Sequence, residues 1–195
     1  MRVTLREFCI QTARLRLRCL SEGDEALYCG LYGDPHTMRF IGPPLSREQA
    51  QRNFHKVLAS LGRQPVERVM LAVIETASDR CIGIAALQEF ELERRRVELG
   101  MMLVREGCGR GFGKEATRAL VSYAFATFEV DEVWIQHDAN SADARRVPVS
   151  LGLLQSTAAK PGKSIWSAYR HSWPADFASN VPDDDGQAPE HTPGK

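Results

Sequence analysis

Four glycines occupy alternate positions of the segment 107–113, between an apolar run that ends at Val104 and an amphipathic pattern that begins near Lys114. Glycine allows sharp turns and close approach of the backbone to a ligand, but each one increases the backbone entropy lost on folding. Such a density therefore favours a ligand-binding loop over a plain connection. The start of a helix also presents unpaired amide N–H groups and a positive dipole end. The sequence thus predicts a strand, a phosphate-binding loop and a helix in series.

Two common phosphate-binding motifs fit this loop poorly. A P-loop requires Ser or Thr after its Gly-Lys pair, but Glu115 follows Lys114, and Cys108 stands where the first glycine belongs. The segment from Gly111 to Ala116 satisfies the relaxed dinucleotide pattern G-x-G-x-x-A. That motif normally opens an alternating β/α array, whereas here it comes late in the chain. A dinucleotide-binding oxidoreductase is therefore a less favoured hypothesis for this chain.

Hydrophobic periodicity before the loop predicts one strand, two helices and three further strands. Polar and apolar residues alternate over 13–20, as in a half-buried strand. Helix-capping patterns follow at Ser21 with Asp24 and at Ser46 with Gln49. Three short apolar runs separated by polar turns then predict an antiparallel meander, over 69–75, 81–87 and 97–104.

After the loop, the pattern predicts one βαβ crossover with two neighbouring parallel strands. A helix is expected over 114–128 and a strand over 133–137. A second helix over 141–151 would contain Pro148, which lacks an N–H and clashes inside a helix. The last expected strand is 164–170.

Length and composition indicate a single intracellular domain. The chain has 195 residues, of which 43% are apolar, so we expect a single domain over 1–177 and a disordered Pro- and Asp-rich tail over 178–195. Lys plus Arg and Asp plus Glu each number 25, which argues against nucleic acid as a partner. The sequence has neither a membrane span nor a signal peptide, and its five cysteines form no C-x-x-C pair. We therefore expect a cytoplasmic protein without a membrane partner, disulfides or bound metal.

The order of these elements, together with the loop, resembles the GNAT N-acetyltransferase superfamily. The acyl-CoA motif Q/R-x-x-G-x-G/A of that family falls on Cys108 to Gly113, with Cys108 in place of Gln or Arg. Four other segments resemble the branch that includes the ribosomal-protein alanine N-acetyltransferases: Thr12 to Arg18, Asp34-Pro35, Val97 to Gly100 and Leu151 to Leu153. The resemblance covers roughly residues 10–175. It implies an α/β (α+β) fold, in which a mixed, mostly antiparallel sheet with one parallel pair has helices on both faces.

The resemblance also implies acetyl-CoA as the cosubstrate, with no metal. The backbone at the end of the strand expected over 97–104 would pair with the pantetheine amides of the cosubstrate. The amides of the glycine loop would hold its pyrophosphate. Arg110 and Lys114 would add charge there, although either is equally interpreted as a solvated loop cation. Asn140 would contact the pantetheine arm or cap a helix. The implied cosubstrate-binding residues are Met102, Leu103, Val104, Cys108, Gly109, Arg110, Gly111, Phe112, Gly113, Lys114 and Asn140.

Transfer of an acetyl group to a primary amine by direct attack in a ternary complex requires a proton acceptor. Glu98 is the candidate base, because it lies on the strand beside the expected thioester. It shares one strand face with Gly100 and Met102, so it is alternatively a polar residue on a wet face. Backbone amides near Met102 are candidates for stabilising the oxyanion. Tyr169 and Ser141 are the two candidate acids for the departing thiolate.

Two further matters stay open at this stage. A non-catalytic CoA-binding protein on the same fold is the leading alternative, because Pro148 and an additional residue alter the segment between Asn140 and Gly152. The acceptor is a protein N-terminus or a small-molecule amine. Members of the family also pair through sheet edges, so a homodimer is one expectation that no local sequence signal identifies.

Overall fold

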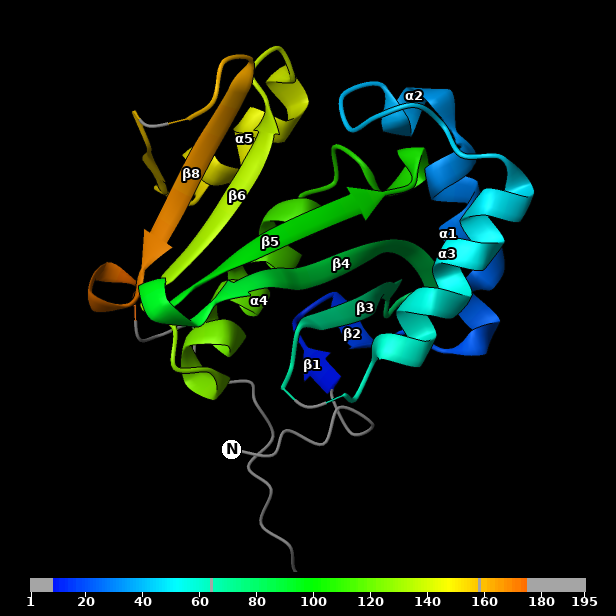
Figure 1. The fold of residues 1–195 in the computed structure, drawn as a ribbon, viewed down its shortest axis with the longest axis horizontal. Coiled ribbons are helices and arrows are strands. Elements are labelled where there is room, and N and C mark those ends of the chain that lie inside the picture. Colours follow the sequence, from blue (N-terminus) through cyan, green and yellow to red (C-terminus); the bar gives the residue numbers. More distant parts are fainter. Residues whose placement is uncertain (1–8, 64, 158, 175–195) are drawn as a thin grey trace, which may run out of the picture.

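The computed structural model describes residues 9–63, 65–157 and 159–174, so the expected tail over 178–195 lies outside the described residues. Within these residues one mixed sheet has the strand order β1-β2-β3-β4-β5-β6-β8-β7 (Figure 1). Its neighbouring strands are antiparallel except for β5 and β6, which are parallel. The strands are β1 (Cys9–Gln11), β2 (Leu15–Cys19), β3 (Arg68–Glu75), β4 (Arg80–Glu91), β5 (Arg96–Leu103), β6 (Glu132–Asp138), β7 (Leu154–Gln155) and β8 (Lys163–Tyr169).

Helices cover both faces of this sheet. Helix α4 packs on one face, and α1 and α3 pack together on the other face over β3 and β4 (Figure 1). The second face is left uncovered by these helices over β6 and β8. The helices are α1 (Glu25–Gly33), α2 (Pro35–Met38), α3 (Arg47–Ser60), α4 (Phe112–Thr127) and α5 (Ala142–Ser150).

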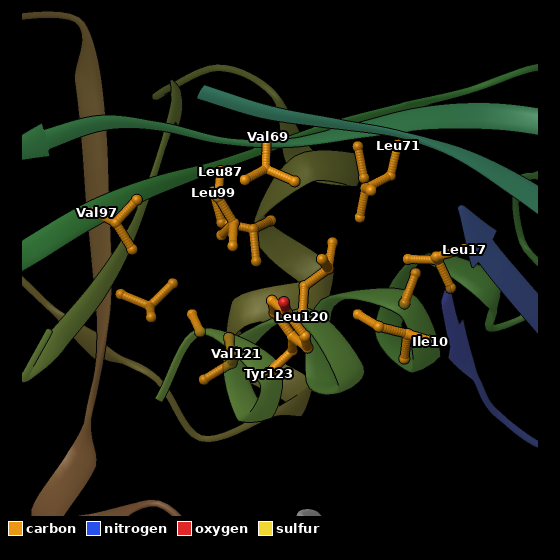
Figure 2. Packing of buried hydrophobic residues seen from close by; sticks show 14 of the residues in the cluster. Ile10, Leu17, Val69, Leu71, Leu87, Val97, Leu99, Leu120, Val121 and Tyr123 are labelled. Atoms are coloured by element: carbon orange, nitrogen blue, oxygen red, sulfur yellow. The ribbon is translucent and has the colours of Figure 1, made fainter. Parts of the chain in front are cut away.

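The core is divided between the two sheet faces because side chains alternate along each strand. In β3, Val69 and Leu71 point toward α4, whereas Met70 and Ala72 point toward α1 and α3. Figure 2 shows the α4 side, where Leu120 and its neighbours on α4 meet side chains from the sheet, among them Ile10, Leu71 and Leu99. Burial of each large side chain there contributes roughly 1.5–3 kcal/mol relative to exposure.

Most elements predicted from the sequence are confirmed. Capping boxes occur at Ser21 and Ser46 as their patterns predict, and the three central strands form the antiparallel meander. The mixed sheet with one parallel pair disagrees with the parallel array of a dinucleotide-binding fold.

Several boundaries differ from prediction. Helix α4 begins at Phe112 instead of 114, because Gly111 caps it with φ +82°. The expected strand 13–20 is shorter, since the Thr12 N–H donates to Leu15 O (2.9 Å) in a turn that leads back to β1. Helix α5 continues through Pro148, which is buried and accepts a hydrogen bond from the Leu153 N–H (3.0 Å). Strands β1 and β7 were not predicted.

No helix in the described part of the chain is both long and apolar enough to cross a membrane. Among the same residues, no group of three or more His, Cys, Asp or Glu side chains is placed to hold a metal ion.

Candidate functional site

The parallel strands β5 and β6 are paired at one end and diverge at the other (Figure 1). Their paired residues end with Glu98 opposite Trp134, whereas β5 stays paired with β4 as far as Leu103 opposite Gly83. Glycine is required at this last position, because a Cβ on Gly83 would lie 2.4 Å from Met102 O. The β6-facing backbone edge of Met101–Leu103 therefore has no strand partner among the described residues. Such an edge can hydrogen-bond the amides of an extended ligand.

The glycine loop brings unpaired amides to the open end of β5. Gly109 and Gly111 adopt left-handed backbone conformations with φ +75° and +82°. No side chain caps α4, and its first helical bond runs from Glu115 N–H to Gly111 O (3.1 Å). The amides of the three preceding residues, 112–114, thus lack an intrahelical acceptor. A Cβ on Gly109 would meet nothing within 4 Å, so this side of the loop is open. Unpaired amides at the start of a helix can bind a phosphate group.

Phe112 fixes the loop to the core. Its side chain is only 2% exposed, so it contributes to a ligand site through its amide alone. The guanidinium groups of Arg14 and Arg110 lie 4.8 and 4.6 Å from its ring centroid. Arg14 also donates from Nη1 to Arg110 O (3.0 Å). These contacts hold the loop against the turn before β2.

The two cations of the loop have different surroundings. Arg110 donates to Glu75 Oε1 (2.6 Å). Hydrogen bonds from Ser78 and then from Arg110 lower the pKa of Glu75, so this carboxylate keeps its charge. Lys114 is half-buried and has no ion pair or hydrogen bond from its side chain to another described residue. Lys114 is therefore the cation free to meet a phosphate.

Glu98 lies where β5 and β6 begin to diverge. It is half-buried, and Gln88 Nε2 donates to its Oε2 (3.4 Å) from the neighbouring strand. Burial raises the pKa of Glu98, and the charge of Glu89 adds to that effect, while the Gln88 hydrogen bond opposes it. A carboxylate with a raised pKa is a better proton acceptor. No sequence signal pointed to Gln88, because the bulge that follows it in β4 hides which residue of β5 it pairs with.

Asn140 and Ser141 lie just beyond the diverging end of β6. Ser141, and not Asn140, caps α5, with its Oγ accepting from the Ala144 N–H (3.4 Å). The Asn140 side chain is exposed and has no hydrogen bond to a described residue, which leaves it available to a ligand. Tyr169 pairs with Glu132 at the opposite end of β6. The structure thus separates the two candidate acids and brings only Ser141 to the open end.

Cys108 follows the end of β5 after a short turn over Arg105–Gly107. Cys108 is exposed, and its Sγ donates to Val104 O (3.5 Å), so the thiol is directed back at the strand. Met102, Leu103 and Val104 are half-buried, with Met102 on the α1–α3 side.

Comparison with known proteins agrees with this geometry. Residues 14–154 match the family model described as an acetyltransferase (GNAT) domain. The chain is 24% identical to the uncharacterized N-acetyltransferase p20 of Bacillus licheniformis, over 80% of this chain and 90% of that protein. It is 30% identical to YdaF of Bacillus subtilis, a protein named provisionally as a ribosomal N-acetyltransferase, over 41% of this chain and 44% of that one.

A solved structure has the same fold at lower sequence identity. Spermidine N-acetyltransferase from Vibrio cholerae, in complex with CoA and spermine, superimposes with a TM-score of 0.70 at 15% identity. The match covers 83% of this chain and 99% of that one.

Proposed function

The chain belongs to the GNAT acetyltransferase family, and on that premise we propose that it transfers the acetyl group of acetyl-CoA to a primary amine. The observation that carries the proposal is the divergence of β5 from β6 beside the start of α4, which no side chain caps. The relatives carry the names of acetyl-transferring enzymes, which sets aside the non-catalytic alternative.

This chain would hold acetyl-CoA mainly through its backbone. The free edge of β5 at Met101–Leu103 would pair with the pantetheine amides, since the Val104 N–H already donates to Ile82 O (2.9 Å). The amides of Gly109–Lys114 would hold the pyrophosphate. Lys114 would add positive charge, and Asn140 would reach the pantetheine arm from β6. The support is geometric, since both backbone segments lie at the diverging ends of the two strands.

In the reaction, the amine nitrogen attacks the thioester carbonyl carbon while both substrates are bound, and the C–S bond breaks. Glu98 would take the proton that the amine must lose, directly or through one water. Backbone amides near Met102, those of Met101 or Leu103 on the edge that faces away from β4, would stabilise the negative charge that develops on the carbonyl oxygen. Ser141 would protonate the departing thiolate, because Tyr169 lies at the other end of β6.

The acceptor is proposed to be a protein N-terminus or a small amine. One relative is named as a ribosomal N-acetyltransferase, and a solved structure with the same fold is a spermidine N-acetyltransferase. We also propose that the enzyme works as a homodimer, as the family resemblance implies.

Incubation with acetyl-CoA and a panel of amines, followed by mass spectrometry, tests this function. The panel contains peptides with free N-termini, polyamines, aminoglycosides and amino acids. We expect a product heavier by one acetyl group from at least one class, and turnover about 100-fold slower in Glu98→Gln. Bound acetyl-CoA without any acetylated product would contradict the proposal.

A further inference from the structure

A cavity of about 650 Å³ lies on the sheet face that α1 and α3 cover. Its walls come from both helices, from the segment that leads into β3 and from the end of β4. Aromatic and apolar side chains form one part of the wall, including Tyr32, Val66 and Phe90. Arg68 lies in the same wall and is the group that points to a ligand.

The guanidinium of Arg68 has a buried donor without a partner. Its Nε is inaccessible to solvent and makes no hydrogen bond. No ion pair joins Arg68 to another described residue, although Glu67 and Glu89 also line the cavity. A buried donor without an acceptor is costly, and a charged one more so. Arg68 as a whole is half-buried and lines the cavity, and a carboxylate bound there would match the planar geometry of its guanidinium.

The strand register connects Arg68 with the proposed base. Arg68 is paired with Gln88, and Gln88 is paired with Glu98. All three side chains lie on the face of the sheet that carries α1 and α3, because their neighbours Val69, Leu87 and Leu99 belong to the α4 side. Neighbouring strands are about 4.8 Å apart, which places the backbones of Arg68 and Glu98 roughly 10 Å from each other. The long arginine side chain closes part of this distance.

We propose that Arg68 binds the carboxylate of the acceptor, and that the acceptor is a free amino acid with a large apolar side chain. Its amine would lie at Glu98, its carboxylate at Arg68 and its side chain against Tyr32 and Phe90. The inference rests on the proposed function and specifies its acceptor. A peptide N-terminus lacks the α-carboxylate, so it would leave the Arg68 guanidinium unpaired.

The test compares L-phenylalanine with L-phenylalaninamide, which has the same shape but no negative charge. The rate of acetyl transfer (kcat/KM) is measured for both acceptors with the wild-type protein, with Arg68→Gln and with Arg68→Lys. Arg52→Gln is the matched control, because Arg52 is exposed on α3 and is not part of the cavity wall. Circular dichroism establishes that each variant is folded.

We expect Arg68→Gln to lower kcat/KM about tenfold for phenylalanine and less than about twofold for the amide, because only the first acceptor carries the partner charge. The loss should appear in KM more than in kcat. Arg68→Lys should retain part of the rate, and Arg52→Gln should match the wild type. Equal losses for both acceptors, or no preference of the wild type for phenylalanine, would overturn the inference.

Calorimetric titration of phenylalanine into the protein saturated with CoA separates this inference from the proposed function. Binding that depends on Arg68, without acetyl transfer, would support the carboxylate site and contradict the proposed function for this acceptor. Transfer to other amines, without binding of phenylalanine, would support the function and overturn the site.

Discussion

Arg14 holds Glu115 from two directions, with its Nε donating to Oε2 (2.7 Å) and its backbone N–H donating to Oε1 (2.9 Å). The Thr12 hydroxyl donates to the same Oε1 (2.6 Å). Glu115 belongs to the first turn of α4, directly after the glycine loop. A single carboxylate therefore ties the turn before β2 to the loop proposed to hold pyrophosphate.

Glu115→Gln should destabilise the fold at neutral pH by about 1 kcal/mol, a modest value because Arg14 is half exposed. Burial raises the pKa of Glu115, but the hydrogen bonds from Thr12 and Arg14 outweigh it and hold the pKa below the usual 4.5. A lowered pKa stabilises the fold above the unfolded-state value and ceases to do so as the pH falls through the folded-state value. Urea unfolding at pH 7 and at pH 3 should therefore show a difference in stability between the two proteins that shrinks in acid. An equal difference at both pH values would contradict the role given to the charge.

Gly109→Ala should weaken acetyl-CoA binding about tenfold or more. Both the strained left-handed backbone and the Cβ that enters the open side of the loop disturb the amides. Gly62→Ala is the matched control, because Gly62 has φ +81° and a Cβ added there would likewise have no neighbour within 4 Å. Both variants should lose about 1 kcal/mol of stability. Equal acetyl-CoA affinities in the two variants, measured by calorimetry, would place the pyrophosphate elsewhere.

Lys114→Gln should raise the Kd of acetyl-CoA several-fold, because its ammonium has no competing carboxylate among the described residues. Arg110→Gln should have a smaller effect on Kd, since Glu75 already binds that guanidinium. Titrations at low and high salt should show that the Kd of acetyl-CoA depends less on salt in the Lys114 variant than in the wild type. The reverse order of effects would indicate that Arg110 leaves Glu75 when the ligand binds.

The pH dependence of kcat should follow the raised pKa of Glu98. The carboxylate is protonated below that pKa and cannot accept a proton, so kcat should rise with pH through an acidic limb. Glu98→Gln should remove this limb along with most of the turnover. A limb that persists in the variant would assign the base to another group.

The same shift predicts a gain in stability from Glu98→Gln. Because burial raises the folded-state pKa, ionisation of Glu98 destabilises the fold once the pH exceeds the unfolded-state value near 4.5. The variant should therefore unfold at a higher temperature than the wild type at pH 7, with a difference that shrinks in acid. Thermal unfolding at both pH values measures this. A variant less stable at pH 7 would show that the Gln88 contact outweighs the burial.

Local signals in the sequence predicted much of the fold. Caps such as Ser46 with Gln49 lie within four residues, and the central strands have apolar runs long enough to recognise. Strands β1 and β7 have three and two residues, too few to show a period. Their existence depends on pairing with β2 and β8, which local sequence does not encode.

Part of the candidate site could likewise be predicted from the sequence, and part of it could not. The glycine loop and Glu98 could be predicted, because their residue types and order carry the signal. The association of Arg68 with Gln88 and Glu98 could not, since it depends on a cross-strand register. A bulge at the end of β4, where the non-glycine residue Glu89 has φ +50°, sets that register. Similarly, only the three-dimensional structure separates Ser141 from Tyr169, which lie at opposite ends of β6.

Isothermal titration of acetyl-CoA into the purified protein, with NADH as the comparison ligand, tests the central claim most directly. The diverging strands and the loop amides predict saturable binding of acetyl-CoA and no binding of NADH. Failure of acetyl-CoA to bind, or equal binding of NADH, would contradict the assignment of Gly109–Lys114 as its pyrophosphate site.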